Sequence, residues 1–295
     1  KKILVLGNSF THYQSSNFIL KRLARSQGHE MRMVPFMKGG EYFRNFPTLS
    51  LSQIAIDEGG YEIALLQDQS EQHARYYSDP VANLGVLTET QALIQRIFVK
   101  SPTARPILEG TWGYLGASNY QGYGSMELFD HALQCGAIAV AESSGAELSP
   151  IGIAFQRARE ANISGLNLYV SDDKHPSRQG CYLKSCVNYC LIYGQKFDSN
   201  VIDCDVDPTI AARLREIAED VVFNGYDIKY FVIGEPDRTS FSTEAGSGST
   251  TVETNVEYTV TCPADWITIE KQEGKVKSAQ DQLDRWISGG KKSLR

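Results

Sequence analysis

Short apolar runs alternate with longer segments of helical hydrophobic period from the start of the chain to about residue 225. The apolar runs predict strands at 2–6, 31–35, 62–67, 106–111 and 147–149, and the periodic segments predict helices at 15–27, 81–99, 126–144, 153–160 and 178–193. Strands that alternate with helices are joined by crossovers, and such units form a parallel sheet with helices on both faces. The sequence therefore predicts an α/β fold in three layers, α/β/α.

Charge and hydropathy exclude two classes of partner. The 295 residues include 29 Lys and Arg against 35 Asp and Glu, a net charge of −6, without a dense basic stripe that could neutralise phosphates. The longest apolar runs are far shorter than the roughly 18 residues that cross a bilayer. We therefore expect no nucleic-acid partner and no membrane span.

The start of the sequence leaves its cellular location open. Lys1 and Lys2 run directly into the first apolar run, without the long apolar region and cleavage site of a signal peptide. The protein is therefore expected to be either cytoplasmic or an exported protein whose leader has been removed.

The pattern changes after Gly225. Apolar and polar residues alternate strictly from 252 to 262, which predicts a half-solvated strand between a Gly/Ser-rich turn at 245–249 and a Pro-Ala-Asp turn at 263–265. We expect residues 1–230 to form one domain and 231–295 a small β unit. From Lys271 the chain is rich in basic residues and is expected to be a solvated tail.

The cysteines show no zinc-binding spacing. They are Cys135, Cys181, Cys186, Cys190, Cys204 and Cys262. Cys186 and Cys190 are four apart on a predicted helix and could share a metal with a third ligand. Buried core thiols are the favoured interpretation, because free Cys behaves as a small hydrophobe. No metal or cofactor is expected.

A serine follows the first predicted strand directly. Gly7, Asn8 and Ser9 place its hydroxyl two residues past the strand, at the edge of a parallel sheet where ligands bind. Ser is also a favoured helix N-cap, so the position of Ser9 by itself is equally consistent with a capping role.

A late loop carries an aspartate and a histidine three residues apart, Asp172 and His175. A serine hydroxyl becomes a good nucleophile when a histidine accepts its proton and a carboxylate holds the imidazole tautomer. Pro176 is expected at the first position of the helix that follows. His12 and His73 compete for the role of base, but neither has an acidic residue three positions before it.

These two segments together resemble the SGNH hydrolases of the GDSL esterase and lipase superfamily. The resemblance covers about residues 2–197. The first block corresponds to Gly7-Asn8-Ser9-Phe10, where Asn8 stands in place of the more common Asp, and the last block to Asp172-Asp173-Lys174-His175. The resemblance implies a flavodoxin-like parallel sheet, with Ser9 as nucleophile, His175 as general base and Asp172 as its orienting carboxylate.

The resemblance also implies an oxyanion hole with three donors. The first is the Ser9 backbone N–H, and the second is a glycine after the second strand, for which Gly40 is favoured because an acidic residue follows it. The third is a side-chain amide. The superfamily usually has Gly-x-Asn there, whereas this chain has Gln67-Asp68-Gln69, so either Gln69 or Gln67 is the expected donor. Both glutamines could instead be a polar cap at a strand end.

The segment after Gly225 resembles the start of a BACON domain, a β-sandwich module. The matching parts are the turn at 246–249, the strand at 252–262 and the run 266–269. This resemblance covers few residues. It implies export to the periplasm or the extracellular space, and a glycan setting.

Aromatic residues bear on the substrate. Trp112 and Tyr114 lie in a glycine-rich segment after the fourth strand, and such rings can stack on sugars, although core packing is the alternative. The expected function is hydrolysis of short acyl esters, above all O-acetyl groups of a carbohydrate. The alternatives are a non-catalytic carbohydrate-binding protein, a lipase or thioesterase, and a flavodoxin-type cofactor binder that uses the 7–11 loop as an anion cradle. The oligomeric state is left open.

Overall fold

The computed structural model describes residues 1–116, 120–226, 231–233, 246–249 and 252–254. The chain divides into two compact units, Lys1–Tyr226 and Asp227–Arg295.

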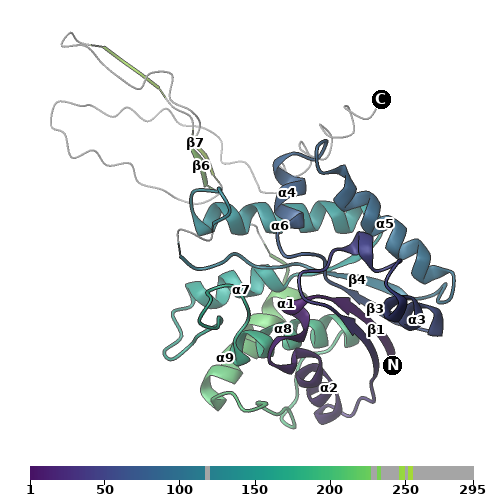
Figure 1. Ribbon diagram of the computed structural model, residues 1–295. Coiled ribbons are helices and arrows are strands. Elements are labelled where there is room, and N and C mark those ends of the chain that lie inside the picture. The colour runs from purple at the N-terminus through teal and green to yellow at the C-terminus, as the bar shows by residue number, and fades with distance from the viewer. Residues whose placement is uncertain (117–119, 227–230, 234–245, 250–251, 255–295) are drawn as a thin grey trace. The chain divides into compact units, whose positions relative to one another are not determined.

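The first unit is built on a sheet of five parallel strands (Figure 1). The strands are β1 (Lys2–Gly7), β2 (Arg32–Met37), β3 (Ile63–Leu66), β4 (Arg105–Glu109) and β5 (Glu147–Ser149), in the order β2-β1-β3-β4-β5. This is the flavodoxin-like order, in which the chain changes direction across the sheet between β1 and β3. The predicted α/β fold is confirmed.

The burial of the strands follows from their places in the sheet. Residues 3–6 of β1 and all of β3 are buried, as expected for strands covered by helices on both faces. β2 is an edge strand and is only partly buried. It can therefore contain Pro35, which has no N–H to donate to a second neighbouring strand.

Helices cover both faces of the sheet: Figure 1 shows α5 and α6 on one side and α2, α8 and α9 on the other. The α-helices are α1 (Ser9–His12), α2 (Ser16–Ser26), α3 (Ser50–Glu58), α4 (Gln72–Ser78), α5 (Leu84–Phe98), α6 (Met126–Ser144), α7 (Ile151–Glu160), α8 (Arg178–Tyr193) and α9 (Pro208–Phe223). Two short 3₁₀ helices are η1 (Tyr13–Ser15) and η2 (Phe43–Asn45). None of the helices of the described residues is long and apolar enough to span a membrane.

Four of the α-helices in the described residues were not predicted: α1, α3, α4 and α9. The first is only four residues long, and α3 exposes Leu51 and Ile54, so its apolar period is weak. A signal for α9 was available, because Asp207 accepts N–H groups at its start and Pro208 occupies the first helical turn. The expected place of Pro176 is wrong: Ser177 is the N-cap of α8, and Pro176 lies before it.

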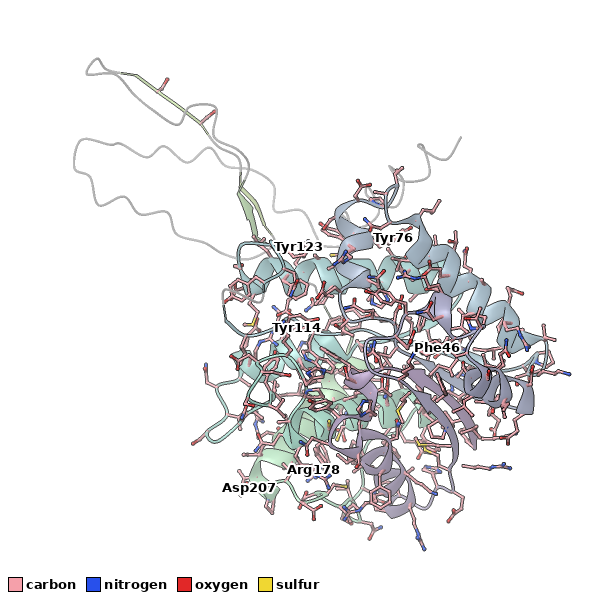
Figure 2. All side chains as sticks on the ribbon, viewed as in Figure 1. Phe46, Tyr76, Tyr114, Tyr123, Arg178 and Asp207 are labelled. Atoms are coloured by element: carbon pink, nitrogen blue, oxygen red, sulfur yellow. The ribbon has the colours of Figure 1, made fainter. Side chains whose placement is uncertain are left out.

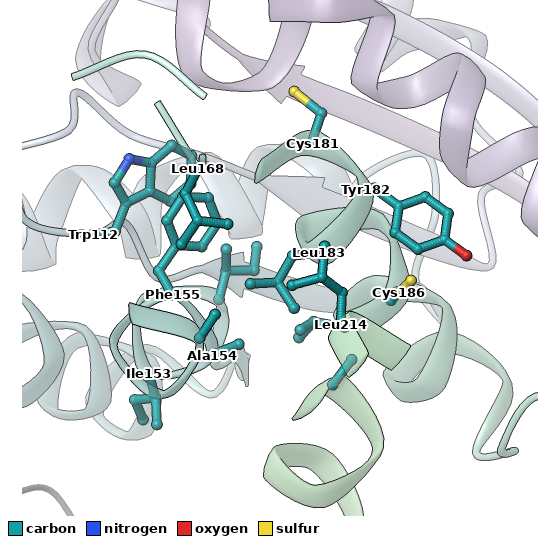
Figure 3. Packing of buried hydrophobic residues seen from close by; sticks show 14 of the residues in the cluster. Trp112, Ile153, Ala154, Phe155, Leu168, Cys181, Tyr182, Leu183, Cys186 and Leu214 are labelled. Atoms are coloured by element: carbon teal, nitrogen blue, oxygen red, sulfur yellow. The ribbon is translucent and has the colours of Figure 1, made fainter. Parts of the chain in front are cut away.

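The apolar core lies between the sheet and the helices. Trp112, Phe155, Leu168, Leu183 and Leu214 belong to one buried cluster (Figure 3), which brings together the segment after β4 and helices α7, α8 and α9. The expectation of buried thiols is confirmed for the cysteines that the structure describes, all of which are free and buried; Cys262 lies outside the described residues.

In the second unit, β6 (Phe231–Ile233) pairs antiparallel with β7 (Val252–Thr254). β7 forms the start of the strand predicted at 252–262. The rest of that strand, the run 266–269 and the basic tail lie outside the described residues. The BACON resemblance and the domain boundary at 230 stay predictions.

Candidate active site

Ser9 follows the carboxyl end of β1, the strand beside the switch point of the sheet, and it is the first residue of α1. Asn8, rather than Ser9, caps this helix, because its side-chain oxygen accepts the Phe10 N–H. Gly7 is required by a close approach: a Cβ there would lie 2.5 Å from Thr11 Oγ1. Because Asn8 supplies the cap, the Ser9 hydroxyl is not used within α1 and can contact a residue outside this helix.

That contact is with His175. The imidazole Nε2 lies 2.8 Å from Ser9 Oγ, and Nδ1 lies 2.6 Å from Asp172 Oδ2. The other carboxylate oxygen of Asp172 accepts the backbone N–H groups of Lys174 and His175. The structure thus brings the three expected residues together in one chain of hydrogen bonds.

The direction of these hydrogen bonds follows from the charge of Asp172. Burial opposes its ionisation, but the hydrogen bonds from the His175 side chain and from two backbone N–H groups together lower the pKa of Asp172 below its usual value. An ionised carboxylate only accepts, so Nδ1 of His175 must donate to it. In the neutral imidazole, Nε2 is then the acceptor for the Ser9 hydroxyl.

Two aromatic rings hold the imidazole. Tyr13 stacks on His175 with ring centroids 4.2 Å apart and 15° between the planes, and Phe10 lies 5.1 Å away, tilted. The first helices place both rings, since Phe10 belongs to α1 and Tyr13 begins η1. We did not identify Tyr13 from the sequence, where its only signal is its nearness to Ser9.

The loop that carries His175 is anchored to the segment after β4. Trp112 Nε1 donates to the Lys174 carbonyl at 3.1 Å, and Leu115 N donates to the Asp173 carbonyl at 2.9 Å. The Trp112 ring stacks on the Phe155 ring with centroids 4.1 Å apart. Both residues are labelled in Figure 3. Trp112 therefore supports the site from within the core.

The expected substrate-stacking role of Trp112 and Tyr114 is wrong, because these side chains are only 1% and 2% exposed. The Tyr114 hydroxyl bonds Ser70 and its ring packs on Phe129. Tyr114 is labelled in Figure 2. The core-packing alternative applies, and neither ring face is available to a sugar.

The two competing histidines, His12 and His73, lie in other surroundings. His73 is buried in α4, where burial lowers its pKa to about 4. His12 is exposed, at the end of α1, and packs against Tyr13. His175 is the histidine that contacts the Ser9 hydroxyl.

The expected oxyanion donors come from three adjacent strands. Ser9 follows β1, Gly40 follows β2 and Gln69 follows β3, and β1 lies between the other two in the sheet. Among the described residues, the backbone N–H groups of Ser9 and Gly40 have no hydrogen-bond acceptor. Gly40 has a φ of +70°, which glycine adopts without strain.

The structure distinguishes the two glutamines. Gln67 is buried; its Oε1 accepts the Asn8 N–H and the Thr11 hydroxyl, and its Nε2 donates to the Asp68 carbonyl. The Gln67 side chain is thus buried and held by Asn8, Thr11 and Asp68, which favours Gln69 as the oxyanion donor. Gln69 is half-buried, and within the described part of the chain only its Oε1 is engaged, by the Glu71 N–H. Its Nε2 remains available as a donor.

A buried ion pair lies beneath the nucleophile turn. Lys184 of α8, 2% exposed, donates to the carboxylate of Glu109 at 2.6 Å and to the Phe10 carbonyl at 3.2 Å. The other oxygen of Glu109 accepts from Asn188. The helix that follows the His175 loop is thereby tied to the turn that carries Ser9.

Removing this cation is expected to be costly. In Lys184→Met, the Glu109 carboxylate stays buried without its partner, so we expect the free energy of unfolding in urea to fall by about 3 to 5 kcal/mol. The double variant Lys184→Met/Glu109→Gln removes both charges and is expected to recover part of the loss. A single-variant loss below about 1 kcal/mol would contradict the importance of the pair.

We also searched the described residues for a metal site and for a cavity away from Ser9. Among the described residues, no cluster of His, Cys, Asp and Glu could hold a metal ion. A surface cavity of about 300 Å³ is lined by residues such as Lys2, Arg32 and Glu62 at the amino ends of their strands. It lies at the opposite end of the sheet from Ser9.

Comparisons with known proteins agree with this architecture. No protein-family model and no curated protein matches the sequence. The fold is similar to that of "a putative SGNH hydrolase from Slackia heliotrinireducens", with a TM-score of 0.51, 24% identity and coverage of 64% of this chain and 96% of the other. The fold is also similar to that of a DUF4886 family protein from Bacteroides uniformis, with a TM-score of 0.62, 16% identity and coverage of 75% of this chain and 94% of the other. For "a putative GDSL-like lipase from Parabacteroides merdae", the TM-score is 0.50 and the identity 12%, with coverage of 65% of this chain and 95% of the other. The chain has the fold of the SGNH/GDSL-type hydrolases.

Proposed function

We propose that this protein is a serine ester hydrolase in which Ser9, His175 and Asp172 carry the reaction. The observation that carries the proposal is the chain of hydrogen bonds from Ser9 Oγ through both ring nitrogens of His175 to Asp172. Its order is that of a nucleophile, a general base and an orienting carboxylate. The fold similarity to SGNH and GDSL-type proteins supports the same class of chemistry.

In the first half of this reaction, Ser9 Oγ attacks the ester carbonyl while His175 Nε2 takes its proton. The new bond turns the carbonyl oxygen into an oxyanion, and the imidazolium is stabilised by Asp172. His175 then gives the proton to the leaving alcohol, and the acyl group stays on Ser9. In the second half, water attacks the acyl group with His175 again as base, which releases the acid and restores Ser9.

The proposed oxyanion donors are the backbone N–H groups of Ser9 and Gly40 and the side-chain amide of Gln69. The first two have no acceptor in the described structure, and the Gln69 Nε2 is also unoccupied. Donors placed in advance cost no reorganisation when charge develops, and each is worth roughly 3 kcal/mol in the transition state.

The substrates that we propose are short acyl esters, in particular O-acetyl groups of a carbohydrate. The loop around Gly40 is exposed and polar, with Lys38 paired to Glu41, so it does not supply a wall for a long chain. The carbohydrate part rests on two partly exposed rings, Tyr13 of η1 and Tyr42 after β2. One face of each ring is covered, by His175 and by Arg44 respectively, so a sugar would use the other face.

The test is an acyl-length series of p-nitrophenyl esters from acetyl to decanoyl, together with acetylated xylan and pectin oligosaccharides. We expect the highest kcat/KM for acetyl, and acetate release from at least one glycan. A higher kcat/KM for decanoyl than for acetyl would contradict the short-acyl proposal. A lack of acetate from every glycan would contradict the carbohydrate proposal while leaving the esterase intact.

A further inference from the structure

A buried aspartate lies between the two glutamines that follow β3. Asp68 is 1% exposed, and its Oδ1 accepts two backbone N–H groups, from Gln69 at 2.8 Å and from Phe43 at 2.9 Å. Its Oδ2 is buried and has no hydrogen-bond partner. The ester-hydrolysis steps described above do not use this carboxyl group.

The contacts of Asp68 join the two loops that carry expected oxyanion donors. Phe43 begins η2 in the segment after β2, three residues beyond Gly40, and Gln69 belongs to the loop after β3. Asn8 connects the same loops to the nucleophile turn, because its Nδ2 donates to the carbonyls of Glu41 and Asp68. One carboxyl oxygen therefore holds two chain segments that are far apart in the sequence at fixed positions beside Ser9.

We propose that Asp68 is a positioning residue that holds the loops after β2 and β3 together, so that Gly40 and Gln69 are aligned to stabilise the oxyanion. This inference rests on the proposed function. The role is one of hydrogen bonding rather than of charge, because both bonds go to neutral N–H groups that an amide oxygen can accept equally well. Asp68 itself is not expected to touch the substrate.

The surroundings of Asp68 fit an acceptor that does not need to be ionised. Burial raises the pKa of Asp68 to about 7, although the N–H groups of Phe43 and Gln69 act in the other direction. The charged groups that face it are Glu89 of α5, which raises the pKa, and Arg44 of η2, which lowers it. The cause is the desolvation of a carboxylate that has no partner for its second oxygen.

Two substitutions separate hydrogen bonding from bulk. Asp68→Asn keeps the shape and an oxygen acceptor, so we expect kcat near that of the wild type. Asp68→Leu keeps the branched arrangement of side-chain heavy atoms, with methyl groups somewhat larger than the carboxyl oxygens, but leaves the Phe43 and Gln69 N–H groups without an acceptor. We expect its kcat to fall about 10- to 100-fold with KM little changed, since oxyanion donors act on the transition state rather than on substrate binding.

A matched control makes the same defect at the other end of β3. Ser101 is buried and its Oγ accepts the Tyr61 N–H, so Ser101→Ala also leaves a buried N–H unpaired. We expect this variant to lose stability but to keep its kcat. All variants are compared by acetyl-ester kinetics well below their unfolding midpoints.

Thermal unfolding at several pH values supplies a readout that does not depend on catalysis. A pKa raised on folding means that the folded state holds an extra proton between about pH 4 and pH 7. The contribution of Asp68 to wild-type stability should therefore fall as pH rises through this window, and it should level off above it. Asp68→Asn should lack this contribution. The Tm of this variant relative to that of the wild type should therefore increase as pH rises.

The outcomes are distinct. A loss of kcat in Asp68→Leu, with Asp68→Asn and Ser101→Ala active, supports the positioning role. An Asp68→Leu variant as active as the wild type, or a Ser101→Ala variant as impaired as Asp68→Leu, overturns it and leaves the esterase standing. A wild-type protein that hydrolyses no ester overturns the proposed function itself, and the positioning role with it. If Asp68→Leu does not fold, an Asp68→Asn variant that folds but loses kcat overturns the role, and one that keeps kcat supports it.

Discussion

Ser9→Ala is expected to lower kcat for ester hydrolysis by at least about 10⁴-fold, as removal of a triad nucleophile does in other serine hydrolases. The Ser9 hydroxyl contacts His175 Nε2, and alanine leaves no atom there that can attack the carbonyl. The oxyanion donors and the binding surface remain, so a small residual rate is expected. Acetyl-ester kinetics with highly purified protein measure it.

The fold should not change in this variant. The Ser9 side chain is only partly buried, and Asn8 rather than Ser9 caps α1. We therefore expect the free energy of unfolding to stay within about 0.5 kcal/mol of the wild type. A folded Ser9→Ala variant that keeps more than about a hundredth of the wild-type rate would remove Ser9 from the nucleophile role.

Asp172→Asn is expected to lower kcat by about 10⁴-fold while leaving the loop intact. The amide Nδ2 can donate to His175 Nδ1, which would place the imidazole proton on Nε2. That tautomer cannot accept the Ser9 proton. The amide oxygen of asparagine can still accept the N–H groups of Lys174 and His175, so the loop keeps its hydrogen bonds.

The pH profile of the wild type provides a further test of this assignment. Because the pKa of Asp172 lies below its usual value, its carboxylate stays ionised down to about pH 4. Activity that is lost on acidification above that pH is therefore not caused by protonation of Asp172. His12→Ala is the matched control, since His12 is exposed and close in sequence to Ser9. An effect of His12→Ala as large as that of His175→Ala would show that the base is misassigned.

The local pattern of the chain was sufficient to predict the layers of the fold and three of the site residues. Continuous apolar runs such as Ile3–Leu6 are typical of buried strands of a covered sheet, and their alternation with amphipathic helices predicts crossovers. The serine after β1 and the Asp172–His175 loop stand at opposite ends of this pattern. Their chemistry is complementary, so their meeting could be expected before any distance was known.

Side-chain direction could not be read from the same pattern. The sequence presents Trp112 and Tyr114 in a glycine-rich segment, which is typical of a binding loop, but the segment turns inward and packs on Phe10, Phe155 and Phe129. An aromatic ring gains more from complete burial than from a half-exposed surface, so tertiary packing overrides the local signal.

The glutamines show the same division between what the sequence by itself determined and what the tertiary structure decided. Either Gln67 or Gln69 could supply an amide after β3, because composition does not say which one has its hydrogen bonds satisfied elsewhere. The strand order β2-β1-β3 decides this, by placing Asn8 and Thr11 against Gln67 and leaving the Gln69 Nε2 free. Hydrophobic periodicity is local and therefore legible along one segment. The order of strands, and the polar contacts between loops that this order creates, depend on segments far apart in the chain, and only the folded structure brings them together.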